Sequence, residues 1–165
     1  MHTVALPGRI AAAVAVAAVA LAAPADAQAQ REVDTGGLAV YIPDNSDVVP
    51  MGAGQEGVND RFKGVVITDD PSSPLYLLSQ NCAGTNLIEA ETGAPSRNSG
   101  YCVGWDADGD LFWMSYWNGP DGGQWSVVNG TGKFEGMTGG GTSELVRAEA
   151  DGRFTLSWRG TLMMK

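Results

Sequence analysis

Three aspartates at alternate positions form the densest cluster of potential ligand side chains in the sequence. Asp106, Asp108 and Asp110 spell a D-x-D-x-D pattern, and carboxylate oxygens are the ligands that calcium prefers. An EF-hand loop also requires glycine at its sixth position and glutamate at its twelfth, where this chain has Leu111 and Trp117. An Asp-Gly pair between β-rich segments is typical of a tight hairpin turn. We therefore interpret the aspartates as a solvated hairpin tip and predict no metal site.

Aromatic side chains gather beside that hairpin. In the predicted strand Leu111–Trp117 the even-numbered positions form one apolar face, and the odd-numbered positions form a second face that is also largely apolar. Such a strand either is covered on both sides or lines a cavity with one face. The hypothesis of a cavity names five candidate ligand-binding residues: Trp105, Trp113, Ser115, Trp117 and Trp125. The alternative is that these side chains fill the core without leaving a cavity.

The first 27 residues have the features of an export signal. Arg9 supplies a positive charge, and Ile10–Ala23 is an apolar run of fourteen residues, shorter than the roughly 20 that span a bilayer. Ala25-Asp26-Ala27 is an A-x-A cleavage site, and Ala27-Gln28-Ala29 is a competing one. The sequence therefore predicts an exported protein, periplasmic or secreted, with no membrane insertion and with a mature domain at residues 28–165.

Loss of the signal removes the only histidine, His2. Ser-His-Asp and Cys-His catalysis are then excluded, as are histidine-ligated metal sites. The signal carries one basic and one acidic residue, so the mature net charge remains −9, which disfavours nucleic acid and anionic membranes as partners. No cofactor is predicted, and no catalytic residue is assigned.

Two cysteines remain, Cys82 and Cys102. In an exported chain an even cysteine count predicts a disulfide between them. A redox or metal role is the alternative, but the two residues are too far apart in sequence for a C-x-x-C site.

The elements that position these residues are predicted to be strands. The sequence has 23 glycines and no long segment with helical apolar spacing, so the class is all-β.

The segment Pro43–Asp60 is predicted to be a long irregular loop, either mobile or a lid. Alternating apolar and polar residues in Arg153–Met164 predict a half-buried last strand, with Phe154 and Leu156 on its apolar face. The strands are expected at Leu38–Ile42, Phe62–Asp69, Leu75–Cys82, Asn86–Glu91, Tyr101–Asp106, Leu111–Trp117, Gln124–Asn129, Thr142–Ala150 and Arg153–Met164. Tight turns between about eight such strands predict one small antiparallel up-and-down β-barrel.

A glycine-rich segment, Asn129–Thr142, separates two of these strands. It lacks the following helix and the Lys-Ser/Thr pair of a phosphate-binding loop, so we interpret it as a tight turn, a bulged strand and another turn. Positive φ angles are expected at Gly132 and Gly136. The overlapping segment Val127–Gly139 resembles the Gly-Gly-Thr-Gly-x-Phe-x-Gly signature of the allene oxide cyclase and dirigent families. A weaker resemblance runs from Tyr101 to Lys165, and it implies a small antiparallel β-barrel.

Three functions are compatible with these features. The first is an exported barrel that binds a small apolar or aromatic molecule. The second is an isomerase, cyclase or dirigent-like enzyme for a small hydrophobic substrate. The first strand, Leu38–Ile42, lacks the carboxylate that the resemblance to plant cyclases implies, and Arg147, Tyr101 and Tyr116 are the nearest candidates for dirigent-type acid catalysis. The third is a structural envelope protein with no small-molecule site. The oligomeric state is left open.

Overall fold

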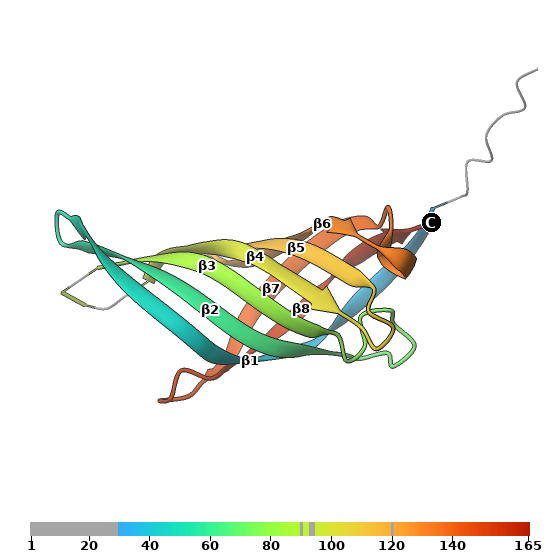
Figure 1. Cartoon of the computed structure of the whole chain (residues 1–165), viewed down its shortest axis with the longest axis horizontal. Coiled ribbons are helices and arrows are strands. Elements are labelled where there is room, and N and C mark those ends of the chain that lie inside the picture. Colours follow the sequence, from blue (N-terminus) through green and yellow to red (C-terminus); the bar gives the residue numbers. More distant parts are fainter. Residues whose placement is uncertain (1–29, 90, 93–94, 120) are drawn as a thin grey trace, which may run out of the picture.

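The chain folds into one closed barrel of antiparallel strands (Figure 1). The computed structural model describes residues 30–89, 91–92, 95–119 and 121–165. The eight strands are β1 (Arg31–Gly52), β2 (Gln55–Thr68), β3 (Ser79–Glu89), β4 (Pro95–Trp105), β5 (Leu111–Gly119), β6 (Gly122–Gly130), β7 (Thr138–Ala148) and β8 (Phe154–Met164). Each pairs with the next, and β8 closes the barrel onto β1, which confirms the predicted up-and-down β-barrel.

The predicted export signal lies outside the described residues and stays a prediction. Within the described part of the chain, no helix is long and apolar enough to cross a bilayer. The only helical element described there is a single 3-10 turn, η1 (Gly132–Phe134).

The first hairpin is longer than predicted. Residues 43–60, predicted to be an irregular loop, belong to β1 and β2, which pair from Gly37–Thr68 to Gly52–Gln55 and project beyond the barrel at one end (Figure 1). Prolines lack the N–H that a ladder uses, so Pro43 and Pro50 argued against a strand. The structure accommodates them where the register of the β1–β2 pair shifts, at each proline. The loop prediction was therefore wrong.

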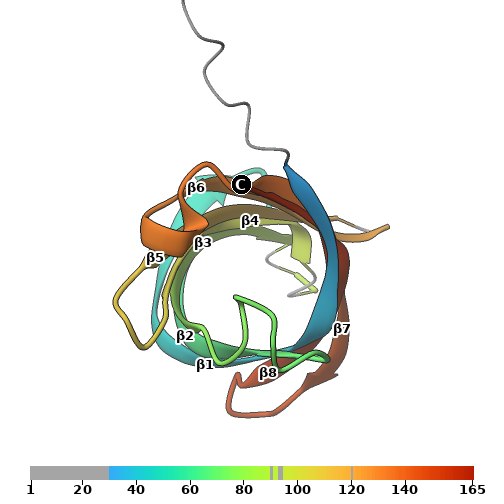
Figure 2. The same cartoon turned by 90° about the vertical axis from the view of Figure 1, so that its right-hand side faces the viewer.

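The connection between β2 and β3 also differs from the prediction. The segment Leu75–Cys82 was expected to be a strand, but residues 71–77 form turns, and β3 begins at Ser79. Two strands were predicted here, Leu75–Cys82 and Asn86–Glu91, but the structure has one continuous strand, β3. Leu75 and Leu78 are buried, because the connection folds inward across one end of the barrel (Figure 2). The start of the predicted strand, residues 75–78, is therefore a buried turn and not part of a strand.

The predicted disulfide is present. Cys82 on β3 and Cys102 on β4 are directly opposite each other in the ladder, with their Cα atoms 4.0 Å apart. Both side chains are buried, so the bond lies inside the barrel.

Two of the three aspartates of the β4–β5 hairpin, Asp106 and Asp110, hold it to the glycine-rich segment. Asp106 accepts hydrogen bonds from the backbone N–H groups of Asp108 and Asp110, and its carboxylate lies 2.5 Å from the Lys133 ammonium. The hydrogen bond from Lys133 lowers the pKa of Asp106. Asp110 accepts the Lys133 backbone N–H at 3.0 Å. As predicted, φ is positive at Gly132 (53°) and at the glycine four residues later. The central part of the glycine-rich segment, between β6 and β7, is therefore a structural corner, and its first and last residues belong to those two strands.

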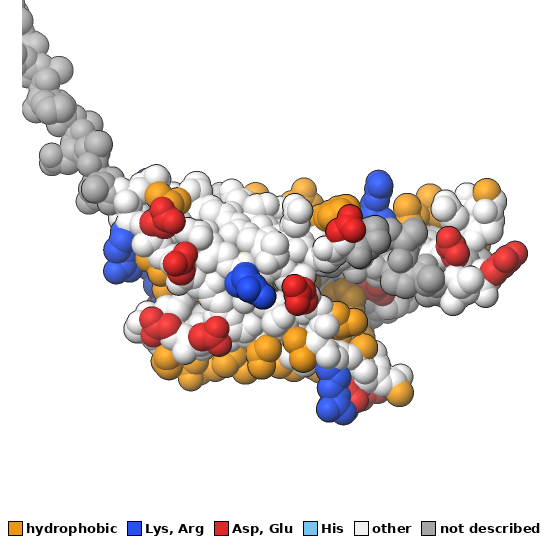
Figure 3. Space-filling view, turned by 180° about the vertical axis from the view of Figure 1, so that it is seen from behind, with side chains coloured by type: hydrophobic (Ala, Val, Ile, Leu, Met, Phe, Trp, Pro, Cys, Tyr) orange, Lys and Arg blue, Asp and Glu red, His pale blue; other side chains and the backbone are white. Residues whose placement is uncertain are grey.

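The outer surface mixes charged and apolar side chains (Figure 3). Hydrophobic side chains are exposed on the outer face of the first hairpin, among them Leu38, Val40 and Ile42 on β1 and Ile67 on β2. The inner face of β8 carries the predicted apolar set, including Phe154, Leu156 and Leu162, and this face joins the core. The alternation of β8 was therefore assigned correctly.

Candidate functional site

The barrel encloses a cavity of about 590 Å³. That volume lies in the range of pockets that bury a small organic molecule. Most of the wall is apolar, with contributions from all eight strands. The principal apolar lining residues are Ala39, Tyr41, Phe62, Val66, Leu75, Leu78, Cys82, Cys102, Phe112, Met114, Trp125, Phe154, Leu156 and Trp158.

One end of the barrel interior is closed by buried apolar side chains. Leu78, Phe112, Phe134 and Leu162 are each less than 2% exposed. The rings of Phe112 and Phe134 meet edge to face, with centroids 5.7 Å apart. Phe134 comes from η1, and Leu78 comes from the inward-folded connection, so two non-strand segments close this end. We call it the closed end.

The other end is where the cavity reaches the surface. Its lining there includes Gly119 and Gly122, which flank the β5–β6 turn, and Gly152 in the β7–β8 turn. Arg97 and Glu144 supply charges of opposite sign at this rim. We call it the open end.

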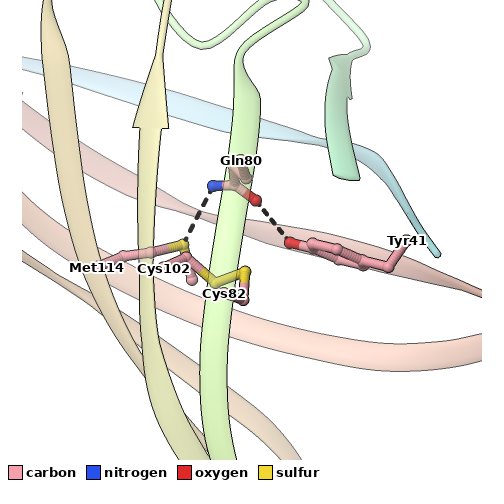
Figure 4. Close-up of a disulfide and its surroundings, with 5 residues drawn as sticks. All are labelled: Tyr41, Gln80, Cys82, Cys102 and Met114. Carbon is pink, nitrogen blue, oxygen red and sulfur yellow. Dashed lines mark hydrogen bonds between the residues drawn. A yellow bond between two sulfur atoms is a disulfide. The ribbon is translucent and has the colours of Figure 1, made fainter. Parts of the chain in front are cut away.

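A hydrogen-bonded pair of polar side chains, Tyr41 and Gln80, belongs to the lining of the cavity (Figure 4). The Tyr41 hydroxyl donates a hydrogen bond of 2.6 Å to Gln80 Oε1, and Gln80 Nε2 lies 3.6 Å from the Met114 sulfur. Both residues are buried, and this burial, followed by the proximity of Tyr116, raises the pKa of Tyr41. The disulfide lies beside them. Because this hydroxyl already has its acceptor, we interpret the group as structural.

A second polar group lines the cavity nearer the open end. Asn86 on β3, Asn98 on β4 and Asn118 on β5 are cross-strand neighbours and all face inward. Asn86 Nδ2 donates to the carboxylate of Asp60, which also accepts the Ser46 hydroxyl. These contacts anchor one side of the group.

Two atoms of this group are buried without a hydrogen-bond partner among the described residues. They are Asn98 Oδ1 and the hydroxyl oxygen of Tyr116. Burial, followed by the charge of Asp60, raises the pKa of Tyr116 to about 12. The hydroxyl is therefore neutral at ordinary pH, and it can donate one hydrogen bond and accept another.

Two glycines make room for this hydroxyl. Gly84 on β3 is opposite Gly100 on β4, and Gly100 is opposite Tyr116 on β5. A Cβ at residue 84 would overlap the Tyr116 hydroxyl oxygen, and one at residue 100 would lie 2.6 Å from it. Both distances are shorter than a Cβ tolerates, so these positions exclude larger residues while Tyr116 keeps this conformation.

The structure separates the five residues that the sequence suggested for ligand binding. Trp125 lines the cavity, packs edge to face on Trp158 at 5.7 Å, and donates from Nε1 to the Arg159 carbonyl at 3.3 Å. The other four do not line it: Trp105 on β4 and Trp113, Ser115 and Trp117 on β5.

The prediction chose the wrong face of β5. The even-numbered side chains Phe112, Met114 and Tyr116 line the cavity, so the intervening side chains point outward. Trp117 is 39% exposed on that outer face. Alternation could not decide between the faces because both are rich in aromatic residues.

Of the three residues suggested for dirigent-type acid catalysis, only one lines the cavity. Tyr116 lies in the cavity, whereas Tyr101 is 65% exposed on the outer face of β4. Arg147 is exposed and forms an ion pair with Glu149 at 2.5 Å. Gln80 and Asn98 were not predicted from the sequence, because a single amide within a strand has no spacing signal until the register is known.

The barrel resembles solved dirigent proteins. The match to the pterocarpan synthase dirigent protein GePTS1 covers 86% of this chain and 94% of that one, with a TM-score of 0.52 and 13% identity. The match to the pterocarpan synthase dirigent protein PsPTS1 covers 83% and 96%, with a TM-score of 0.48 and 11% identity. No family model matches the sequence, and no curated protein does. The resemblance to GePTS1 confirms the predicted dirigent-like barrel at the level of the fold.

Proposed function

We propose that this protein is an exported β-barrel that binds a small, largely apolar or aromatic molecule inside the barrel. The observation that carries the proposal is the cavity of about 590 Å³, with apolar walls, packed at one end and reaching the surface at the other. Transfer of apolar surface from water into such a cavity contributes about 25 cal/mol per Å². A molecule with two fused rings would thus have enough apolar surface to bind.

The export part of the proposal is supported by the signal-like residues 1–27 and by the Cys82–Cys102 disulfide. Disulfides persist in oxidising compartments outside the cytosol. Intact-mass measurement of protein recovered from its host should give a chain that begins after Ala27 or Ala29. A chain that retains its first residues would contradict export by cleavage.

Binding is tested with the neutral fluorescent probe N-phenyl-1-naphthylamine. Trp125 and Trp158 line the cavity, so a bound probe should quench tryptophan emission and gain fluorescence itself. Met114→Trp places a larger side chain in the cavity and should weaken probe binding about tenfold or more, by filling the volume that the probe needs. Ser115→Trp adds the same side chain on the outer face and is the matched control.

The result that contradicts the proposal is a folded wild-type protein that binds no probe. Equal weakening by the two tryptophan variants would also contradict it, because the probe would then bind outside the cavity. In either case a structural role without a small-molecule site would be favoured.

A second candidate is an isomerase, cyclase or dirigent-like enzyme that acts on a small hydrophobic substrate. The fold likeness to GePTS1 favours it, together with the hydroxyl and amide groups of Tyr116 and Asn98 inside an apolar cavity. Such catalysis can rely on positioning a reactive substrate. An enzyme would convert a bound molecule into an isomer of equal mass and different chromatographic retention, whereas a binding protein would release it unchanged.

A further inference from the structure

A row of aromatic side chains runs along the outer face of β4 and β5, which lie side by side in the barrel wall (Figure 1). At successive outward positions of this strand pair, one strand or the other carries an aromatic residue. In order from the open end, the row is Trp117, Tyr101, Trp113 and Trp105. Its three tryptophans are residues that the sequence suggested for ligand binding and that do not line the cavity. We call this set the aromatic row.

The register of the β4–β5 ladder gives the row its shape. Tyr101 is opposite Ser115, which lies between Trp113 and Trp117 on β5, so the aromatic residue changes strand at each step. Diagonal neighbours across an antiparallel pair are about 7–8 Å apart. The whole row covers about six residue steps of strand, or about 20 Å. It is therefore an elongated track and not a compact patch.

The rings of the row are accessible from outside the barrel. Tyr101 is 65% exposed and Trp117 is 39% exposed, while Trp105 and Trp113 are half-buried. None of the four packs on another aromatic ring or uses its hydroxyl or indole N–H in a hydrogen bond with a described residue. The six-membered ring of Trp117 lies over Gly119, where a Cβ would come within 2.5 Å of it. Glycine at that position thus lets the indole lie along the strand.

The outer face around the row has no charged side chain. This holds for residues 79–87 of β3, 99–105 of β4, 111–117 of β5 and 124–128 of β6, in a chain with a net charge of −9. A charged partner would find no opposite charge on this face, and complementary charge is what selects such partners. The face therefore favours a neutral partner.

Hydroxyl and amide side chains are interleaved with the rings. Ser115 lies within the row and shares a hydrogen bond of 3.3 Å with Ser126 on β6. Asn81 on β3 and Gln124 on β6 are exposed beside the row, and their amides form no hydrogen bond with a described residue. Hydrocarbon cannot pair such groups, so a lipid surface or a purely apolar partner would leave them unsatisfied.

Sugar rings match both kinds of side chain. A pyranose ring presents C–H groups on its faces and hydroxyls at its edges, so its face stacks on an aromatic ring while its edge bonds hydroxyl and amide groups. The chains of cellulose and chitin are extended and flat, so that successive sugars can follow an elongated track, whereas the chain of amylose coils. We infer that the aromatic row binds a neutral polysaccharide with extended chains of the cellulose or chitin type. The inference goes beyond the proposed cavity function and does not depend on it.

Native affinity electrophoresis tests the inference with four soluble polysaccharides. Hydroxyethylcellulose and glycol chitin are neutral and extended, amylose is neutral and coiled, and alginate is extended and anionic. We expect at least one of the first two to retard wild-type protein, with an affinity roughly tenfold or more above that for amylose and for alginate.

Variants assign the binding to the row. Trp117→Ala should weaken it about tenfold because a stacked ring is lost, and Trp117→Phe, which keeps a ring, should retain most of the affinity. Tyr101→Ala is a second variant, at the most exposed position of the row. Tyr76→Ala is the matched control, because Tyr76 is also 39% exposed but lies in the β2–β3 connection, and it should change the affinity by less than about twofold. Melting temperatures verify that each variant is folded.

The inference is overturned if neither extended neutral polysaccharide binds, or if amylose or alginate binds as tightly. It is also overturned if Trp117→Ala and Tyr76→Ala weaken binding equally. Displacement of N-phenyl-1-naphthylamine by cellohexaose would place the sugar in the cavity and overturn the inference as well. If no polysaccharide binds and Trp117→Ala converts a dimer into a monomer in gel filtration, the face is instead a contact between copies of this chain.

The two proposals can fail separately. Binding of N-phenyl-1-naphthylamine by wild-type protein decides the cavity function, whereas retardation by the polysaccharides decides the role of the aromatic row.

Discussion

The closed and open ends of the barrel interior are built from the same strands but differ in packing and in polarity. At the closed end, the four most deeply buried side chains are all apolar: Leu78, Phe112, Phe134 and Leu162. Nearer the open end, two buried polar atoms lack partners and a cavity remains. Close packing maximises stability, whereas unpaired polar atoms lower it. The difference teaches that stability is concentrated at one end, and that the other can be specialised for a ligand.

Strand β5 shows how one element serves both ends. Its inward residues change along the strand from Phe112, through Met114, to Tyr116 and Asn118. The disulfide between β3 and β4 lies between the two zones, beside the hydrogen bond from Tyr41 to Gln80. Substitutions at the two ends should therefore have separable effects.

The largest effect is expected at the closed end. Phe134→Ala removes a fully buried ring that packs on Phe112 and should lower the free energy of unfolding by about 3–5 kcal/mol. Leu145→Ala, at a residue that lines the open end and is 63% exposed, should cost less than about 1 kcal/mol. Urea unfolding of both variants measures the difference. Similar losses would remove the contrast between the ends.

Loss of the disulfide should have the next largest effect. The bond spans 20 residues, and in the chain-entropy model replacement of both cysteines by alanine costs roughly 3 kcal/mol. Urea unfolding of the double variant tests this value, and thiol titration of denatured, unreduced wild-type protein should find no free thiol. Two free thiols per chain would show that the bond does not form.

Alkaline pH should destabilise the protein partly through the open end. The folded-state pKa of Tyr116 is raised from 10.0 to about 12, because burial disfavours its charged form. The stability that this group contributes is present below pH 10 and is lost as the pH rises through 12. Since the group is partly exposed, we expect a loss on the order of 1–2 kcal/mol.

Tyr116→Phe should remove this part of the pH dependence and leave the part due to Tyr41, whose pKa is also raised by burial. Urea unfolding across pH 9 to 12 provides the measurement, with Tyr101→Phe as the exposed control. Identical pH profiles for the two variants would contradict a buried, neutral Tyr116.

The smallest effect is expected for an aromatic residue on the outer face of the barrel, away from both ends of the cavity. Trp113 points away from the cavity, so Trp113→Ala should change the affinity for N-phenyl-1-naphthylamine by less than about twofold. Trp125→Ala, on the inner face, should weaken binding roughly tenfold, because an aromatic contact with the probe is lost. Fluorescence titration compares them. A stronger effect at Trp113 would mean that the probe binds to the outer face.

Much of the fold could be predicted from local sequence patterns. Alternation in Arg153–Met164 identified a half-buried strand, and the Asp-Gly pair identified the turn before β5. Both signals are local, because they depend on the two-residue period of a strand and on the φ angles of a turn. The first hairpin was missed because its prolines, Pro43 and Pro50, are tolerated only through register shifts in the β1–β2 pair.

The candidate site could be predicted only in small part. Trp125 was assigned to the cavity, but Trp113 and Trp117 were assigned to the wrong side of the wall. Gln80 and Asn98 were not recognised at all. A strand with two aromatic faces has no internal signal for which face is inside, and closure of the barrel makes that choice.

The sequence by itself determined the all-β class, the partner of each cysteine and the corner at Gly132, because each depends on residue type or on short-range geometry. The tertiary structure alone decided which side chains meet. Tyr41 and Gln80 are 39 residues apart, and Asn98 and Tyr116 come from different strands. These groups share one cavity because eight strands pair in a particular register and β8 closes onto β1, and register is a property of the whole sheet.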